Sequence, residues 1–450
     1  MVMREIAHQV RPRWMSADVS LLMAARGVMS AGRTLAGVIV PIYLAQNGFS
    51  SLRLGVLFAV IGISSALMSA SVGLLSERVG RKPFIVAVPL LTAMSALVFA
   101  FSPDAALIFV FAALGTFGRG AGAGGGQVGP YQPAEQTLVT EATPAEHRNS
   151  VFGRLAFFSA LGALVGGQLA RIPEVAARAG LHGNAAYQPA FVAVAALSLG
   201  AAVLAMPVRD VRRAPASGRR LISLPSQSWP FLLKLWATNS VNGLAVGFVG
   251  PFLTYWFYRR YGVGPGNIGL LYSLVNAVSL LSNLSAARIA GRLGLVRTVV
   301  IGRSIQAILL GVMVLAPTFW LAGAVYLVRM LAQRVAMPLR QSYVLAMVPA
   351  EERGAVAGLA NLPAQATSAA APPVAGYLFD SVGLAVPFEI AALLQGVNTA
   401  LFYLFFRRLR PPEEREHLDA AGDAGTLAVP QMEGAMHDPD DLAPPGGGAA

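Results

Sequence analysis

Arginines inside apolar stretches are the residues whose type and spacing point most directly to chemistry. Arg26 and Arg33 are seven residues apart within residues 18–45, so a helix would carry both on one face. Later apolar stretches are interrupted by Arg119, Arg329 and Arg334. Burying an unpaired charge is costly, so each guanidinium must face water, a partner or a bound ligand. The sequence therefore predicts a basic interior.

Few acids accompany these arginines. No carboxylate lies at the centre of an apolar stretch; Glu135 lies toward the end of residues 105–138, and Glu389 lies in residues 384–406. Two interpretations stay open for the arginines. They attract an anionic ligand through charge-assisted hydrogen bonds, or they bond backbone carbonyls and short polar neighbours and so fix the packing. The predicted binding residues are Arg33, Arg119, Gln127, Tyr131, Asn239, Asn242, Arg329, Gln333 and Arg334.

The composition indicates that lipid surrounds the chain. Hydrophobic residues make up 55% of the 450 residues and charged residues 12%, about half the charged share of a soluble domain. The net charge of +12 would suit nucleic acid or an anionic membrane surface, and the hydropathy favours the membrane, so we expect no nucleic-acid partner. The absence of cysteine excludes disulfides and thiolate metal sites, and the five histidines form no recognisable metal-binding or catalytic constellation. We expect neither an enzyme nor a bound cofactor.

Twelve stretches are long and apolar enough to cross a bilayer, which takes about 20 residues. They cover residues 18–45, 51–75, 83–101, 105–138, 150–172, 188–207, 230–257, 266–290, 297–315, 319–346, 355–377 and 384–406. Basic residues gather in alternate links, so the positive-inside rule predicts that both termini are cytoplasmic and that the protein lies in the plasma (inner) membrane. Tyr255, Trp256 and Tyr258 are expected to form an aromatic belt at the outer interface.

An internal repeat divides the chain into two related halves. Residues 133–148 (PAEQTLVTEATPAEHR) return as residues 338–353 (PLRQSYVLAMVPAEER), with seven identities at an offset of 205 residues. Such a long period indicates a duplicated domain. The predicted organisation is a cytosolic segment 1–17, a six-helix bundle 18–207, a basic linker 208–229, a second six-helix bundle 230–406 and a disordered acidic tail 407–450.

The segment between the second and third stretches, GLLSERVGRKP at residues 73–83, resembles the signature loop of the major facilitator superfamily. Gly73, Glu77, Arg78, Gly80, Arg81 and Lys82 fall on its pattern, with Glu77 in place of the more usual aspartate. The second half repeats the loop weakly at residues 287–297, at an offset of 214 residues that also relates Gly269 to Gly55. The resemblance implies an all-α membrane fold of twelve helices in two pseudo-symmetric bundles, with helices 1, 4, 7 and 10 lining a central cavity.

The signatures of drug/proton antiporters within this superfamily are degraded. Arg119 stands about where those proteins have an arginine in helix 4, but the surrounding run, residues 118–130, is richer in glycine. This run lacks the ending of a phosphate-binding loop, so its glycines are expected to serve close packing or bending. In helix 5, Gly162, Gly166 and Gly167 remain, while Ala163 replaces the expected proline. This departure weakens a drug-antiporter mechanism and leaves helix packing intact.

A charge difference between the two repeats provides a candidate gate. Glu135 corresponds to Arg340 by the offset of 205. We hypothesise that the two residues face each other across the pseudo-two-fold axis and close the cytosolic mouth when the carrier opens outward. The signature-loop residues and this pair are the predicted gating residues. Arg26, nearer the helix end, is expected to reach the inner interface or to serve packing.

These observations predict a secondary transporter, a monomer embedded in lipid that moves a small solute by alternating access and is driven by an ion gradient, with protons expected. The basic interior favours export of an anionic or carboxylate-bearing solute. Proton-coupled multidrug efflux of hydrophobic compounds by an antiporter is the alternative, and a non-transporting membrane scaffold is an alternative of a different class.

Overall fold

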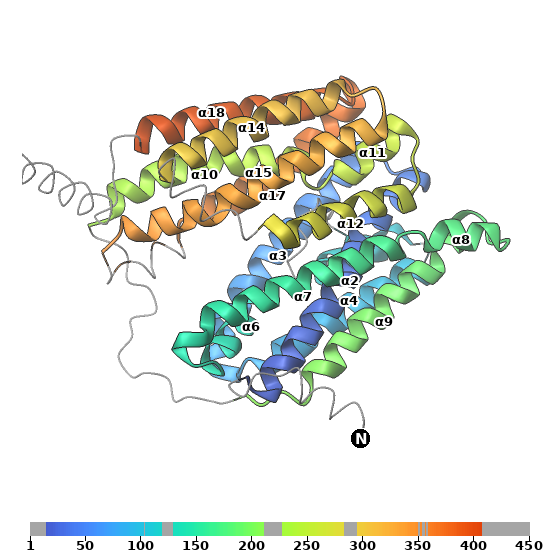
Figure 1. Cartoon of the computed structure of the whole chain (residues 1–450). Coiled ribbons are helices and arrows are strands. Elements are labelled where there is room, and N and C mark those ends of the chain that lie inside the picture. The colour runs from blue at the N-terminus through green and yellow to red at the C-terminus, as the bar shows by residue number, and fades with distance from the viewer. Residues whose placement is uncertain are drawn as a thin grey trace, which may run out of the picture. The chain divides into compact units, whose positions relative to one another are not determined.

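A computed structural model of the chain describes residues 15–102, 104–118, 129–210, 227–282, 295–349 and 359–406, with residues 352 and 356 (Figure 1). Inside the helices, the side chains of residues 77–78, 279–282, 295–297 and 334–343 are among those left undescribed. Every regular element in the described part is a helix. Most of the predicted linker and all of the predicted acidic tail lie outside it, so those boundaries stay predictions.

The first half of the chain supplies the helices of the N-terminal bundle. These are α2 (Ala17–Gln46), α3 (Ser51–Val79), α4 (Lys82–Phe101), α5 (Ala105–Leu114), α6 (Gln132–Glu141), α7 (Arg148–Leu169), the short α8 (Ile172–Arg178) and α9 (Gln188–Ala205). Local chemistry fixes several starts, because the side chains of Ser16, Ser50 and Asp104 accept backbone N–H bonds from the first turns of α2, α3 and α5.

The second half forms the C-terminal bundle. Its helices are α10 (Trp229–Val249), α11 (Leu253–Tyr261), α12 (Pro265–Ser282), α14 (Leu295–Leu315), α15 (Phe319–Ala346), α17 (Leu362–Ser381) and α18 (Val386–Phe406). A described helix occupies each of the twelve predicted stretches. Among the residues described, seven helical segments are long and apolar enough to cross a membrane, and shorter apolar helices supplement them. The predicted all-α fold of two six-helix bundles is confirmed.

Two of the stretches are not the single helices that their hydropathy predicted. The stretch 105–138 is divided because α5 ends at Leu114 and the chain then takes left-handed backbone at Thr116 (φ 47°) and Gly118 (φ 79°). The stretch 230–257 is divided between α10 and α11 around Gly250 and Pro251, since proline cannot supply the next helical N–H. Hydropathy alone does not register such breaks.

Close approach between helices depends on glycine where the prediction placed it. A Cβ at Gly162 or Gly166 of α7 would collide with the backbone of α2, at Gly27 and Ala31 respectively, while Gly167 faces Gly269 of α12 instead. The Ser30 hydroxyl of α2 also donates to the Ser159 carbonyl at 2.7 Å. The helix-packing role predicted for the glycines of the fifth stretch is therefore met.

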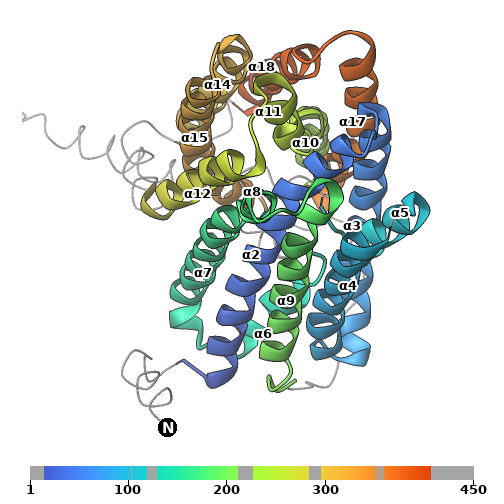
Figure 2. The ribbon, with the colours of Figure 1, turned by 90° about the vertical axis from the view of Figure 1, so that its right-hand side faces the viewer.

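The two bundles meet at one end of their helices. This end, called the α8 end here, carries α8 and the links α2–α3, α11–α12 and α17–α18, on the right-hand side of Figure 1 and facing the viewer in Figure 2. There α3 runs beside α17 and α7 beside α12, and one apolar core joins residues of both bundles, such as Phe58 with Phe252. At the opposite end, called the loop end, a second core draws only on the described N-terminal bundle.

Candidate functional site

A buried ion pair joins the first and fourth predicted stretches. The Arg26 Nη1 of α2 lies 2.7 Å from the Glu135 Oε2 of α6, and the two residues are 6% and 1% exposed. Tyr131, one turn before Glu135, is also buried and lies within electrostatic range of both charges and of Arg33. The expectation that Arg26 reaches the inner interface is wrong, because a carboxylate on a neighbouring helix holds it in the interior, where the pair joins the two helices.

Arg33 contacts the chain on both sides of the undescribed segment 119–128. Its Nη1 and Nη2 donate to the hydroxyl and carbonyl oxygens of Thr116, each at 3.2 Å. On the other side, Gly129 has φ 107°, and a Cβ there would lie 2.7 Å from Arg33 Nη1. These bonds to a carbonyl and a short polar side chain are those that the packing interpretation predicts for Arg33. Both acceptors are neutral, so the contacts do not compensate its charge.

Arg329 is the corresponding mid-helix arginine of the C-terminal bundle. It lies in α15, is 8% exposed and packs beside the buried Tyr326 and Met330. Its Nη1 contacts the Met330 sulfur at 3.9 Å, and its Nε has no hydrogen-bond partner. No carboxylate within the described residues pairs with Arg329. A buried guanidinium left in this state is a candidate anion-binding group.

The predicted amides of α10 turn toward their own bundle. The Asn239 Nδ2 donates to the Ala360 carbonyl at 2.5 Å, and the Asn242 Oδ1 accepts at 3.4–3.5 Å from Gln395 and Asn398 of α18. The structure thus joins Asn242 to a polar cluster on α18 that the sequence reasoning missed. Gln333 of α15 is half-buried. Arg119 and Gln127, and the side chains of Glu77, Arg78, Arg334 and Arg340, lie outside the described residues.

The signature-like loop is tied to its own bundle at the loop end. Gly80 takes φ 103°, which ends α3 and turns the chain into α4. The Arg81 side chain forms an ion pair with Glu141 at the end of α6. The carboxylate of Asp210 caps α4 by accepting the backbone N–H groups of Arg81, at 2.7 Å, and Lys82, at 3.2 Å. Around Gly73, by contrast, a Cβ would meet nothing within 4 Å.

Asp210 and Glu141 were not selected from the sequence. Asp210, which follows α9, is the acid that meets the N-terminus of α4. The available signal was the position of Asp210, an isolated acid in a basic run (residues 208–213) that must end beside the start of α4 in an antiparallel bundle.

Comparison with known proteins identifies the fold. The profile of the Major Facilitator Superfamily matches residues 22–238 and again residues 235–430. The chain belongs to the Major Facilitator Superfamily. Its double match agrees with the duplication read from the sequence, and membership shows a multi-pass membrane transporter of a small solute rather than an enzyme.

Solved structures of superfamily members resemble the chain in fold. A bacterial homologue of the human lysosomal transporter Spinster, in an inward-facing occupied conformation, has a TM-score of 0.68 at 13% identity over 88% of this chain and 98% of its own. The nucleoside transporter NupG has a TM-score of 0.64 at 13% identity over 87% of this chain and 99% of its own. An uncharacterized membrane protein of Saccharomyces cerevisiae, YJR124C, is 20% identical over 63% of this chain and 70% of its own length.

The aromatic residues at the end of the seventh superfamily helix do not form the expected belt. Trp256 is fully buried and packs on Phe388 of α18 with 4.8 Å between ring centroids, and Tyr255 is 4% exposed. The division at Pro251 makes α11 a separate short helix, and its rings turn into the core shared by both bundles. For Tyr255 and Trp256 the prediction of an interfacial belt is wrong.

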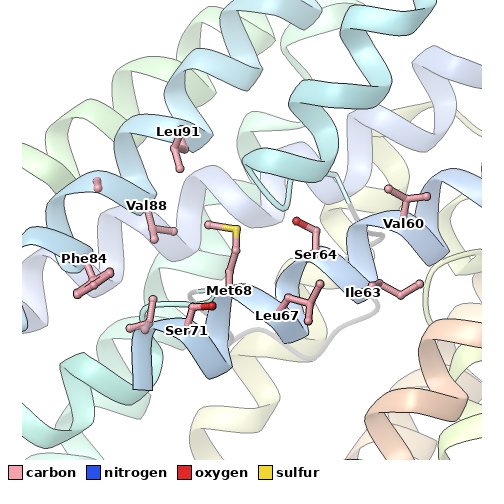
Figure 3. A pocket seen from close by; sticks show the side chains of 11 residues that line it. Val60, Ile63, Ser64, Leu67, Met68, Ser71, Phe84, Val88 and Leu91 are labelled. Carbon is pink, nitrogen blue, oxygen red and sulfur yellow. The ribbon is translucent and has the colours of Figure 1, made fainter. Parts of the chain in front are cut away.

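A groove of about 580 Å³ lies between α3 and α4 (Figure 3). Val60, Leu67 and Met68 line one wall, and Phe84, Val88 and Leu91 line the other. No charged side chain lines the groove, and none of the predicted binding residues does so. A groove with this apolar lining offers no charged partner for an anion.

Proposed function

We propose that the protein exports a small anionic or carboxylate-bearing solute by alternating access of its two bundles. The observation that carries the proposal is the charge balance of the interior. Arg33 and Arg329, one from each bundle, lie near the middle of long helices and contact only neutral acceptors among the described residues. The buried acid of the described interior, Glu135, is already paired with Arg26.

An arginine stays protonated in a protein, so this interior keeps a positive charge that needs a counter-ion. A solute carboxylate or phosphate would meet that need through charge-assisted hydrogen bonds. Arg33 and Arg329 come from different bundles. The affinity for a solute that contacts both would therefore depend on how one bundle is positioned against the other. Arg119, Gln127 and Arg334 remain proposed members of the same site, together with Tyr131 and Gln333.

The proposed driving force is a proton gradient, and Glu135 is the group placed to carry the proton. Protonation of this carboxylate would break its ion pair with Arg26 and leave a third interior arginine uncompensated. This change in the interior charge would link proton binding to the conformational state of the carrier. We further propose that both termini face the cytoplasm, with the loop end inside, the α8 end outside, and the protein in the plasma (inner) membrane as a monomer.

The test is a thermal-shift screen of the purified protein against organic anions, sugars and hydrophobic drugs, followed by flux into proteoliposomes at two pH values. A solute that binds only the folded state raises the unfolding temperature, and more so the further its concentration exceeds its dissociation constant. We expect anions to stabilise the protein, and Arg33→Ala and Arg329→Ala to abolish both that stabilisation and flux without unfolding the chain. Arg171→Ala, at an exposed arginine of the α8 end, is the matched control.

Two results would decide against the proposal. Wild-type flux in Arg33→Ala and Arg329→Ala would exclude the anion site. Stabilisation by hydrophobic cations alone, with flux that depends on pH through Glu135, would favour the alternative of proton-coupled multidrug efflux.

A further inference from the structure

Two carboxylates connect the bundles at the α8 end, one from each bundle. Asp380, at the end of α17, accepts the backbone N–H groups of Ser51 at 3.1 Å and Leu52 at 2.9 Å, in the first turn of α3. Glu174, in α8 just after α7, accepts the N–H of Gly266 at 2.9 Å, in the first turn of α12. Each acid therefore caps a helix that belongs to the opposite bundle.

The two contacts are one contact made twice by the internal repeat. Leu52 and Gly266 are 214 residues apart, the offset that relates Gly55 to Gly269. Glu174 and Asp380 are 206 residues apart, one more than the offset of the repeated stretches. The end of the fifth helix of each half thus reaches the start of the second helix of the other half. An accidental surface contact would not obey this symmetry.

Glycine packing below each cap obeys the same symmetry. A Cβ at Gly55 would collide with the backbone of Pro372, and a Cβ at Gly269 with the backbone of Gly167. Pro372 and Gly167 are again 205 residues apart. The helices can approach this closely only when no side chain intervenes.

The glycines at the start of α12 also make room for the carboxylate. A Cβ at Gly264 would collide with Glu174 Oε1, and one at Gly266 would lie 2.6 Å from Glu174 Oε2. On the α3 side, Ser50 caps the third N–H while Asp380 takes the first two. The helix N-termini attract a carboxylate because their unpaired N–H groups carry partial positive charge.

We infer that Glu174 and Asp380 form a paired clasp that holds the α8 end closed and thereby sets the balance between the two states of the transport cycle. Opening at this end must withdraw both carboxylates from the opposite bundle and separate both glycine contacts. Among the described residues, the hydrogen bonds between bundles lie from this end to mid-helix, including Ser51 with Tyr255 at 2.7 Å and Ser273 with the Leu164 carbonyl at 2.8 Å. The Asp380 bond to Leu52 is exposed, so water can replace it when this end opens.

The inference rests on the proposed alternating access, and its test requires no solute. The chain has no cysteine, so spin labels can be attached to introduced cysteines without background. One pair, at the exposed Leu181 and Trp320, reports the α8 end, and a second pair, at the exposed and repeat-related Pro144 and Pro349, reports the loop end. Distances are measured by pulsed dipolar spectroscopy on the full-length protein in lipid nanodiscs.

We expect Glu174→Gln with Asp380→Asn to raise the ratio of α8-end-open to α8-end-closed molecules by about fivefold per cap, the usual worth of a helix cap. The α8-end distance should lengthen while the loop-end distance shortens, a reciprocal change that a merely destabilised protein would not show. Glu389→Gln, at an exposed carboxylate near the same end, is the control and should leave both distributions unchanged.

Unchanged distances in a well-folded double variant would overturn the clasp. If the double variant does not fold, each single variant must still show at least a twofold shift, and its absence would overturn the clasp equally. Glu174→Asp should restore part of the closed population, because the shorter acid keeps the charge. Absence of solute flux with a normal distance shift would count against the proposed function and leave the clasp standing.

Discussion

The guanidinium of Arg26 and the carboxylate of Glu135 lie 2.7 Å apart on two helices of the N-terminal bundle, nearly sealed from solvent. Two opposite charges in a medium of low polarity stabilise each other only while both are present. The pair therefore links the stability of the bundle to the protonation of one residue. It also gives Arg26 a role that its position near a helix end does not reveal.

Removing one member of this pair should destabilise the protein far more than removing both. Glu135→Ala leaves a buried guanidinium uncompensated and should cost about 3–5 kcal/mol of unfolding free energy. The double variant Arg26→Met with Glu135→Leu should recover most of the loss. Thermal unfolding in detergent measures both, with Glu389→Gln as the exposed control. Equal destabilisation by the single and double variants would show that the ion pair is not the cause.

The glycine contact between α7 and α2 gives a second stability prediction. A methyl group at Gly162 would collide with the Gly27 backbone, so Gly162→Ala should lower stability by about 1–3 kcal/mol through overpacking. Gly153→Ala in the same helix is the matched control, since nothing lies within 4 Å of a Cβ there. That control should be neutral or stabilising, because alanine favours a helix more than glycine does. Equal unfolding temperatures for the two variants would contradict the packing assignment.

Much of the fold can be predicted from the sequence because an apolar stretch long enough to cross a bilayer can form few structures other than a transmembrane helix. The stretches and the offset of 205 residues predict the helices and the duplication, and the superfamily match confirms both. The break after Leu114 was less accessible. It depends on left-handed backbone at Thr116, a residue type that rarely takes it, held by the Arg33 side chain from another helix.

The site was predicted less well because its contacts depend on which side chain reaches across a helix pair. Residue type singled out Arg33, Arg329 and Glu135 as functional candidates, since a charge in an apolar stretch needs an explanation. Partners could not be read in the same way. Glu135 has an equivalent in Arg340 by sequence, but Arg26 contacts it in space, and helix rotation decides that choice. Nothing in the sequence around Asp380 and Glu174 indicates a partner. Their role depends on contacts with the first turns of helices in the opposite bundle, which only the structure shows.

Gly129 should be essential to the position of Arg33. Its φ of 107° is strained for any side chain, and a Cβ would lie against the Arg33 guanidinium. Gly129→Ala should therefore reduce solute flux at least about tenfold if displacing Arg33 costs one interior hydrogen bond to a charged group, about 1.5–3 kcal/mol. Gly396→Ala, at an open position of α18, is the control. Flux into proteoliposomes and the stabilisation by anions should fall together. Normal flux in Gly129→Ala would show that Gly129 is not needed to position Arg33.

The proposed gate between Glu135 and Arg340 can be tested once the contact with Arg26 is taken into account. A simple charge exchange would place an arginine at position 135 directly against Arg26, so the exchange belongs in an Arg26→Met background. There Glu135→Arg should abolish flux, because it would face Arg340 when the loop end closes. Adding Arg340→Glu restores an opposite-charge pair and should recover solute counterflow, which requires no proton gradient, by about tenfold or more, as expected when a buried charge regains its partner. Failure of Arg340→Glu to rescue at normal expression would show that the two residues do not meet in the cycle, and Glu135 would then act through Arg26 alone.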